Sequence, residues 1–275
     1  MTEPILALSV PGMGRMYRHP VSGELYPSVT NVIQVLGKPW LDAWAAKLVA
    51  GYAWDNRETL MQIEDREAAV DMLKGVTRRR RDAAADVGST IHAYVESLFT
   101  DEPRPQIESE HEPYIVALQG FLAEFDPEFV VVEGTIFSSE FPEDLRYAGT
   151  FDFLARIDGH LVLGDYKTGS GVYEEVGLQL AALRRGEALW DRHSGELSPM
   201  PDVEACVAVH LRPEGFALHV IRADDAAYQA FLGLRQAWPW TKNQSGIVGP
   251  RMNRVRLLKE LGAVAPTTEQ ESLGV

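Results

Sequence analysis

The sequence predicts an α/β protein, with a short mixed sheet flanked by helices and a mainly helical N-terminal portion. Three observations support this fold class. Residues 149–169 read as a tight hairpin, GTFDFLARIDGHLVLGDYKTG. Strand-like apolar runs lie on both sides of this hairpin, at 129–137, 203–212 and 215–223. Helical periodicity dominates the part of the sequence that precedes them.

The length of 275 residues allows a substantial buried core. We expect a single domain over residues 1–264, made of a mainly helical portion (1–112) and an α/β portion (113–264), followed by a polar tail (265–275). The first residues lack a basic segment followed by a sustained apolar stretch, and no run approaches the roughly 18 apolar residues of a membrane span. These features predict a cytoplasmic protein without a membrane partner.

Charge and cysteine content exclude several classes of protein. The chain has 26 Lys and Arg against 40 Asp and Glu, a formal net charge of −14. This charge argues against sequence-independent binding of the nucleic-acid backbone by the protein surface as a whole, so any contact with nucleic acid must be local. The single cysteine, Cys206, excludes an intramolecular disulfide, a four-cysteine zinc site and an iron-sulfur cluster. We expect Cys206 to be a buried strand residue.

The N-terminal portion contains several helix signals. Ser28 or Thr30 can cap a first helix, which residues 37–39 (Gly-Lys-Pro) should end. A second helix is expected from Trp40, and its tryptophans are expected to lie in the core. The helices predicted after it are a charged segment at 57–74, the arginine run 78–81 and an amphipathic segment at 82–99. Residues 101–113 read as a loop.

The α/β portion alternates helices and strands. Helices are predicted at 113–125, at about 172–190 and at 225–238. The strands are the run 129–137, the two strands of the hairpin, and a second hairpin-like pair at 203–223. This order predicts a short mixed sheet with helices packed on it.

The hairpin brings two carboxylates together. Asp158-Gly159 favours a two-residue turn, so Ile157 should pair with His160, and Asp152 should then lie opposite Asp165. Like charges directly opposed on two strands are destabilising, so a cation is expected between them. Lys167 lies two positions beyond Asp165 and therefore on the same face of the strand.

These residue types suit phosphodiester chemistry. Asp152 and Asp165 are hard oxygen ligands for Mg²⁺ or Mn²⁺, and Lys167 could orient an attacking water or stabilise developing negative charge. We therefore predict attack of water on phosphorus. The alternative is that the two acids are solvated strand residues and that Lys167 pairs with one of them. The bulky neighbours argue against this alternative, because they place the hairpin in the core: Phe151, Phe153, Leu161, Leu163 and Tyr166.

The stretch AGTFD, the hairpin, GDYKTG, Gln179 on the following helix and the upstream GSTIHAYVE together resemble the RecB-like branch of the PD-(D/E)XK nuclease superfamily, especially its phage-encoded exonucleases. The resemblance covers residues 28–211 in pattern. It implies a restriction-endonuclease-like core in which Asp152 and Asp165 bind metal and Lys167 is catalytic. It further implies that His92 is a metal ligand and that Gln179 orients the lysine or the scissile phosphate.

The function that the resemblance implies is a Mg²⁺- or Mn²⁺-dependent DNA exonuclease of phage recombination, replication or repair. It would act in the cytoplasm of the bacterial host or of a bacterium. Leu183 stands where members of this branch often have Tyr, which leaves a stacking or phosphate contact there in doubt. No GxxxxGK[ST] phosphate loop is present, so a recombination, helicase or single-strand-binding partner would be a separate chain. Oligomeric state and polarity of digestion stay open.

Two further acids have alternative interpretations. Glu133 lies within an apolar run that should neighbour the hairpin, either as an auxiliary metal or water ligand or as a strand-end acid paired with an arginine. Glu96, four residues after His92, could orient the imidazole or lie on a solvated helix face.

The densest positive run is the other candidate for function. It is a candidate for gripping the DNA backbone, together with two arginines further along the chain; the six residues are Arg78, Arg79, Arg80, Arg81, Arg184 and Arg185. The alternative is a cluster that only aids solubility. Two other classes of function also stay open: a catalytically silent nucleic-acid-binding or assembly module on the same fold, and a hydrolase of small phosphoesters.

Overall fold

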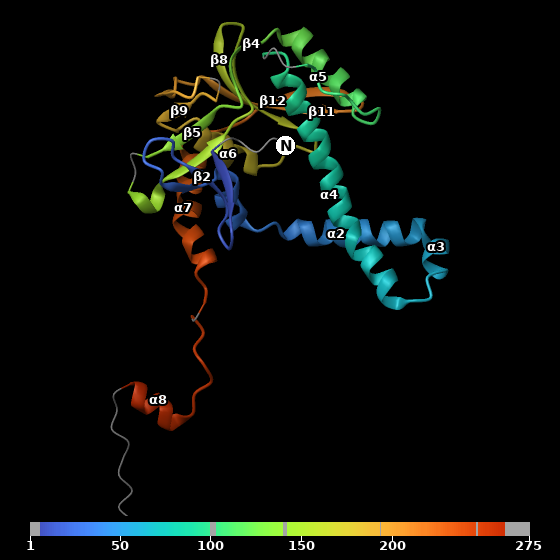
Figure 1. The fold of residues 1–275 in the computed structure, drawn as a ribbon, viewed down its shortest axis with the longest axis vertical. Coiled ribbons are helices and arrows are strands. Elements are labelled where there is room, and N and C mark those ends of the chain that lie inside the picture. The colour runs from blue at the N-terminus through green and yellow to red at the C-terminus, as the bar shows by residue number, and fades with distance from the viewer. Residues whose placement is uncertain (1–5, 100–102, 140–141, 193, 246, 262–275) are drawn as a thin grey trace, which may run out of the picture.

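The computed structural model describes residues 6–99, 103–139, 142–192, 194–245 and 247–261 (Figure 1). It is a mixed α/β structure, as predicted. Three sheets form the body together with several helices, and part of the helical portion projects from the body as an arm. The polar tail predicted at 265–275 lies outside the described residues.

The described part of the chain begins with a three-stranded antiparallel sheet that was not predicted from the sequence. Its strands are β1 (Ala7–Val10), β2 (Gly14–Arg18) and β3 (Leu25–Pro27), in the order β1-β2-β3. The strands are too short to establish an alternation of apolar and polar residues. The expectation that helices dominate from the start of the chain was therefore wrong for residues 7–27.

The helix signals that follow are partly confirmed. α1 (Val29–Ile33) is capped by Ser28, whose Oγ accepts a hydrogen bond from Asn31 N at 3.0 Å. A short 3₁₀ turn, η1 (Gln34–Leu36), precedes the predicted break. α2 (Pro39–Asp55) and α3 (Arg57–Met61) come next.

The charged segment predicted at 57–74 divides between α3 and a long helix, α4, which also replaces the segments predicted at 78–81 and 82–99. α4 (Arg66–Glu96) begins at the cap Asp65 and runs through the arginine run without a break. Its first half forms the arm with α2 and α3, and its second half enters the body, where Ile91 and Val95 are buried (Figure 1). α5 (Glu112–Phe125) follows, close to its predicted bounds.

The central sheet contains the predicted hairpin at its middle. Its order is β12-β11-β8-β7-β4, with β8 and β11 parallel and the other neighbours antiparallel. The strands are β4 (Glu128–Val132), β7 (Phe153–Ile157), β8 (His160–Lys167), β11 (Ala205–Arg212) and β12 (Gly215–Val220). The predicted mixed sheet and the second hairpin are therefore confirmed, and Cys206 is a buried residue of β11.

A four-stranded sheet, ordered β10-β9-β5-β6, corrects two predictions. The run 129–137 is not one strand, because it divides between β4 and β5 (Thr135–Ser138), which belong to different sheets. The helix predicted at 172–190 ends early, since α6 (Glu175–Leu183) gives way to strand β9 (Ala188–Trp190). The remaining strands are β6 (Tyr147–Thr150) and β10 (Leu197–Pro199), and a short turn, η2 (Glu143–Leu145), precedes β6.

Helices cover both faces of the central sheet. One core combines α1, α6 and α7 (Asp225–Lys242) with the hairpin, and the other combines α4 and α5 with the opposite face. α8 (Arg254–Glu260) lies apart from the body at the end of an extended segment (Figure 1). Among the described residues, none of the helices combines the length and the apolar composition that crossing a bilayer requires.

Candidate metal centre

The site begins at a shared bend of two strands. The segments 128–138 and 147–157 form a long antiparallel ribbon that passes from the central sheet to the four-stranded sheet. At the bend, Glu133 N donates to Asp152 O at 3.0 Å, and Phe151 N donates to Gly134 O at 3.0 Å. A Cβ on Gly134 would lie 2.3 Å from the Phe151 ring, so only glycine allows this approach.

Glu133 adopts an unusual backbone conformation at this bend. Its φ of 56° lies in the left-handed region, which residues other than Gly, Asn and Asp seldom adopt. Such residues persist where the surrounding structure determines them, and they cluster at functional sites. Here the conformation ends β4 and allows the Glu133 carboxylate to reach His92.

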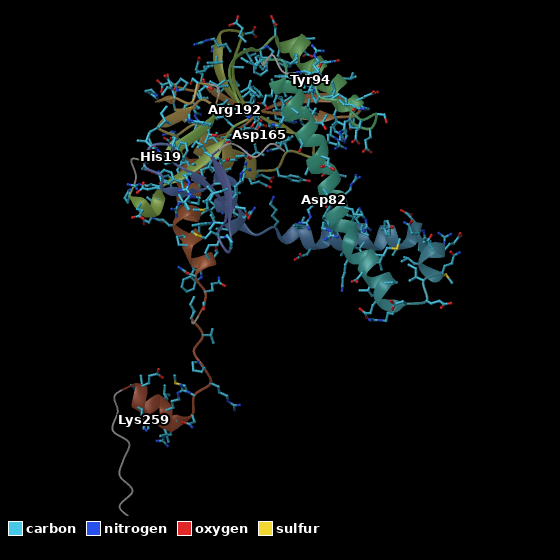
Figure 2. The ribbon with its side chains drawn as sticks, in the orientation of Figure 1. His19, Asp82, Tyr94, Asp165, Arg192 and Lys259 are labelled. Atoms are coloured by element: carbon cyan, nitrogen blue, oxygen red, sulfur yellow. The ribbon has the colours of Figure 1, made fainter. Side chains whose placement is uncertain are left out.

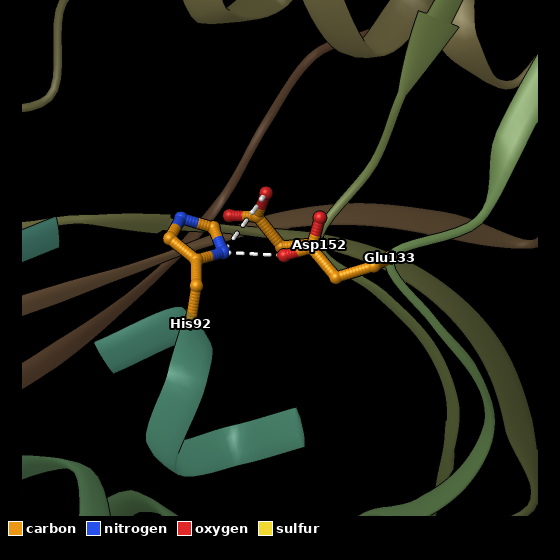
Figure 3. Close-up of side chains that lie close together, drawn as sticks. All are labelled: His92, Glu133 and Asp152. Atoms are coloured by element: carbon orange, nitrogen blue, oxygen red, sulfur yellow. Dashed lines mark hydrogen bonds and ion pairs between the residues drawn. The ribbon is translucent and has the colours of Figure 1, made fainter. Parts of the chain in front are cut away.

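Three potential ligands converge beside the bend (Figure 3). His92 Nδ1 lies 2.5 Å from Glu133 Oε1 and 3.9 Å from Asp152 Oδ1. One ligand atom from each of these three residues lies within 4.8 Å of the others. Glu133 is therefore the partner of a histidine and not of an arginine, and α4 brings the imidazole to both carboxylates.

A second group lies at the end of β8. Asp165 is 2% exposed, and its Oδ1 accepts a hydrogen bond from Gln179 Nε2 at 2.9 Å. The Lys167 ammonium contacts Asp165 Oδ2 and donates to Gln179 Oε1 at 3.4 Å. Gln179 thus holds both the acid and the amine, which is the contact with the lysine that the resemblance implied.

The predicted hairpin register is confirmed from Ile157↔His160 to Phe153↔Gly164. Asp152 and Asp165 would form the next pair, but the ladder ends before them. Asp152 instead accepts a hydrogen bond at Oδ2 from Tyr166 N, at 2.5 Å. The three-residue ligand cluster consequently contains Glu133 and not Asp165, which pairs with Lys167.

The electrostatics of the site are those of clustered acids. Burial raises the pKa of Asp165 to about 6, and the charge of Asp152 adds to the rise while Lys167 opposes it. Burial also raises the pKa of Asp152, against the opposing effects of His92 and Lys167. Burial lowers the pKa of His92, but the charges of Asp152 and Glu133 and the hydrogen bond to Glu133 outweigh it and raise the pKa to about 9. The two aspartates therefore hold protons more strongly than exposed carboxyl groups do.

The donor set fits a divalent metal ion. Two carboxylates supply hard oxygen ligands of the kind that Mg²⁺ and Mn²⁺ take, and an imidazole suits transition ions such as Mn²⁺. An ion would take the place of the protons that the raised pKa values retain. His92, Glu133 and Asp152 are the residues that would hold it.

A cavity of about 270 Å³ opens onto both groups. Its wall also includes two residues of β2, Arg15 and Tyr17, which the sequence analysis did not identify because the N-terminal strands were not predicted. Tyr17 OH is hydrogen-bonded to Thr150 Oγ1 at 3.0 Å, and the Arg15 guanidinium lies 5.6 Å from the Tyr17 ring centre. Arg15 adds a guanidinium to this cavity, beside the Lys167 ammonium and the protonated His92 imidazole.

Glu96 lies on the wall of the same cavity, one turn after His92. It forms an ion pair with Arg192, 2.9 Å long, in which both side chains are 19% exposed. Glu96 is therefore not on a solvated helix face. The contact ties α4 to the segment that follows β9.

The predicted arginines are not brought to the cavity. Arg78 to Arg81 are exposed on α4 just before Asp82, on the part of the helix that leaves the body (Figure 2). Arg184 donates to Val203 O at 2.5 Å and to Ala223 O at 3.4 Å. These contacts tie the Arg184 guanidinium to the backbone of the body. Arg185 is exposed and forms an ion pair with Asp225.

Comparison with known proteins gives little. No family model matches the sequence, and no curated protein matches it. A solved structure titled "Crystal structure of SSO0001" is similar with a TM-score of 0.31 and 15% sequence identity, over 60% of this chain and 72% of that chain. A similarity of this degree is too weak to support an argument about fold or function.

Proposed function

We propose that the protein is a metal-dependent DNA nuclease with a PD-(D/E)XK core, and that it acts as an exonuclease in phage recombination, replication or repair. The observation that carries the proposal is the meeting of two groups in one cavity. His92, Glu133 and Asp152 form a potential metal seat, and Asp165 with Lys167 lies beside it. The choice of an exonuclease rests on the sequence resemblance alone.

A divalent ion bound by His92, Glu133 and Asp152 would polarise a phosphoryl oxygen and make its bound water a better nucleophile. The lysine has a separate task. Burial lowers the pKa of Lys167, but the charges of Asp165 and Asp152 outweigh this effect and raise it above its ordinary value. The side chain is therefore an ammonium at neutral pH. It is suited to orient water or to stabilise negative charge, and not to accept a proton.

The cavity also offers contacts for the substrate. A phosphodiester carries one negative charge, and Arg15 is placed on the wall to bind a non-bridging oxygen through its guanidinium. The exposed run Arg78 to Arg81 would contact the DNA backbone further from the reacting phosphate. Local contacts of this kind suit a chain whose net charge is −14.

The test is cleavage of labelled linear and circular DNA in Mn²⁺, in Mg²⁺ and in EDTA. We expect metal-dependent cleavage by the wild-type protein and none by Asp152→Ala or Asp165→Ala. Glu128→Ala, which changes an exposed acid at the start of β4, is the matched control and should cleave normally. Degradation of linear but not circular DNA would support an exonuclease.

Two outcomes would contradict the proposal. Binding of DNA without metal-dependent cleavage would favour a silent binding module on this fold. Cleavage of nitrophenyl phosphate esters but not of DNA would favour a hydrolase of small phosphoesters.

A further inference from the structure

Two parts of the protein expose large apolar side chains to solvent. The arm, residues 39–81, consists of α2, α3 and the first half of α4, and the C-terminal segment, residues 243–261, consists of an extended tether and α8. Figure 1 shows them on opposite sides of the molecule. Neither part lines the cavity, and the proposed function uses only the run Arg78 to Arg81 at the end of the arm.

The arm has apolar side chains at positions that are exposed to solvent. α2 has only three charged residues in seventeen, Asp42, Lys47 and Asp55, yet none of its side chains described between 41 and 55 is buried. Trp54 is 72% exposed and Met61 is 86% exposed, so the expectation that the tryptophans of α2 lie in the core was wrong for Trp54. A helix that is apolar on all sides is ordinarily covered by other parts of a protein.

The tip of the arm is also acidic. Residues 54–71 contain two basic residues, Arg57 and Arg66, against six acids. The local net charge is therefore −4. All six acids are exposed: Asp55, Glu58, Glu64, Asp65, Glu67 and Asp71. A partner for this surface should combine apolar side chains with positive charge.

The C-terminal segment has this combination. Residues 243–261 contain four cations against one acid, Glu260, a local charge of +3 in an acidic chain; the cations are Arg251, Arg254, Arg256 and Lys259. On α8, Leu257, Leu258 and the C-cap residue Leu261 share one helix face with Arg254, while Arg256, Lys259 and Glu260 lie on the other. Leu257 is 46% exposed and Leu261 is 70% exposed.

We propose that α8 docks on the arm of a second copy of this chain, and that two copies exchange these contacts about a two-fold axis. The apolar face of α8 would cover Trp54 and Met61, and its cations would face the acidic tip. The charges of +3 on the C-terminal segment and −4 on the arm tip are opposite, and each contact removes two exposed apolar surfaces from water. The second copy is favoured because α8 lies well apart from its own arm, below the body at the lower left of Figure 1, whereas the arm projects to the right.

The test is the oligomeric state, measured by sedimentation equilibrium on the full chain at concentrations of about 10 to 100 µM, since small interfaces bind weakly. We expect a wild-type dimer. The tail variant, Leu257→Glu with Leu258→Glu, and the arm variant, Trp54→Glu with Met61→Glu, should each raise its dissociation constant at least about tenfold. Matched controls are Val248→Glu on the tether, 91% exposed, and Val21→Glu in the N-terminal sheet, 80% exposed. Both controls should dimerise normally.

Mixing the two variants decides between exchange and contact within one chain. The tail variant retains an intact arm and the arm variant retains an intact α8, so a mixture restores one of the two contacts and should form heterodimers. A monomeric wild-type protein, a dimer that neither variant weakens, or a mixture that stays monomeric would each overturn the proposal. So would a tail variant that dimerises normally but loses affinity for DNA or for anionic vesicles, because α8 would then serve a different polyanion.

Discussion

The proton on His92 makes a quantitative prediction about metal binding. A metal ligand must be neutral imidazole, but the pKa of His92 is raised to about 9 by Asp152 and Glu133 acting against burial. At pH 7 a group with this pKa is neutral in about one molecule in a hundred. Binding of Mn²⁺ must therefore displace a proton. Because the pKa is raised, this competition is present throughout the range below about pH 9 and disappears above it.

The apparent affinity for Mn²⁺ should accordingly rise about tenfold per pH unit, or about 100-fold between pH 6.5 and 8.5. Isothermal titration calorimetry in buffers of different ionisation enthalpy measures both the affinity and the number of protons released, and close to one proton is expected at pH 7.5. His92→Gln should bind Mn²⁺ more weakly, and its affinity should depend much less on pH.

His160→Gln is the matched control for this experiment. His160 also has a raised pKa, because Glu204 accepts its hydrogen bond, but it lies at the hairpin turn outside the cavity. This variant should retain the steep dependence on pH. An affinity of the wild-type protein that is constant from pH 6.5 to 8.5, or a 100-fold rise that survives in His92→Gln, would refute the assignment of His92 as a ligand.

Three other predictions concern the bend, the lysine and the cavity wall. Gly134→Ala should reduce the free energy of unfolding by about 1–3 kcal/mol, because the added Cβ would overlap the buried Phe151 ring. Gly51→Ala, where the added Cβ meets open space on α2, should not reduce it. Chemical denaturation measures the free energy of unfolding of both variants. Lys167→Ala should abolish DNA cleavage while Mn²⁺ still binds, and residual turnover near the wild-type rate would contradict its proposed task. Arg15→Ala should raise the KM for DNA, whereas Arg18→Ala, an exposed change on the same strand, should not alter it; equal effects would remove Arg15 from the substrate contacts.

The sequence predicted the parts of the site that local signals determine. Asp158-Gly159 determines the turn, and the turn determines the register that brings Asp152 and Asp165 to the same end of the hairpin. Gln179 could be placed on a helix from its apolar neighbours, and Lys167 could be placed beside Asp165 from the alternation of a strand. Each of these inferences spans only a few residues of chain.

The parts that were missed depend on contacts between distant segments. Glu133 reaches His92, 41 residues away, only because a non-glycine residue takes a left-handed conformation that no propensity would predict. The helix predicted at 172–190 is interrupted in the sequence by the run 184–187, Arg-Arg-Gly-Glu. Gly186 packs so closely on Ile136 of β5 that a Cβ there would lie 2.6 Å away, and the chain then pairs with β5 as strand β9. Arg15 could not be found without the small N-terminal sheet that carries it.

The bend at Glu133 and Asp152 also joins three bodies of the protein. Glu133 ends the central sheet, Asp152 lies where the ribbon enters the four-stranded sheet, and His92 belongs to the helix that continues into the arm. A metal ion bound by all three residues would cross-link these parts of the protein. The affinity for the ion would therefore depend on the orientation of the arm relative to the body. The coupling is reciprocal: a partner that binds the arm would change the affinity for the metal ion by the same free energy by which the ion changes the affinity for that partner.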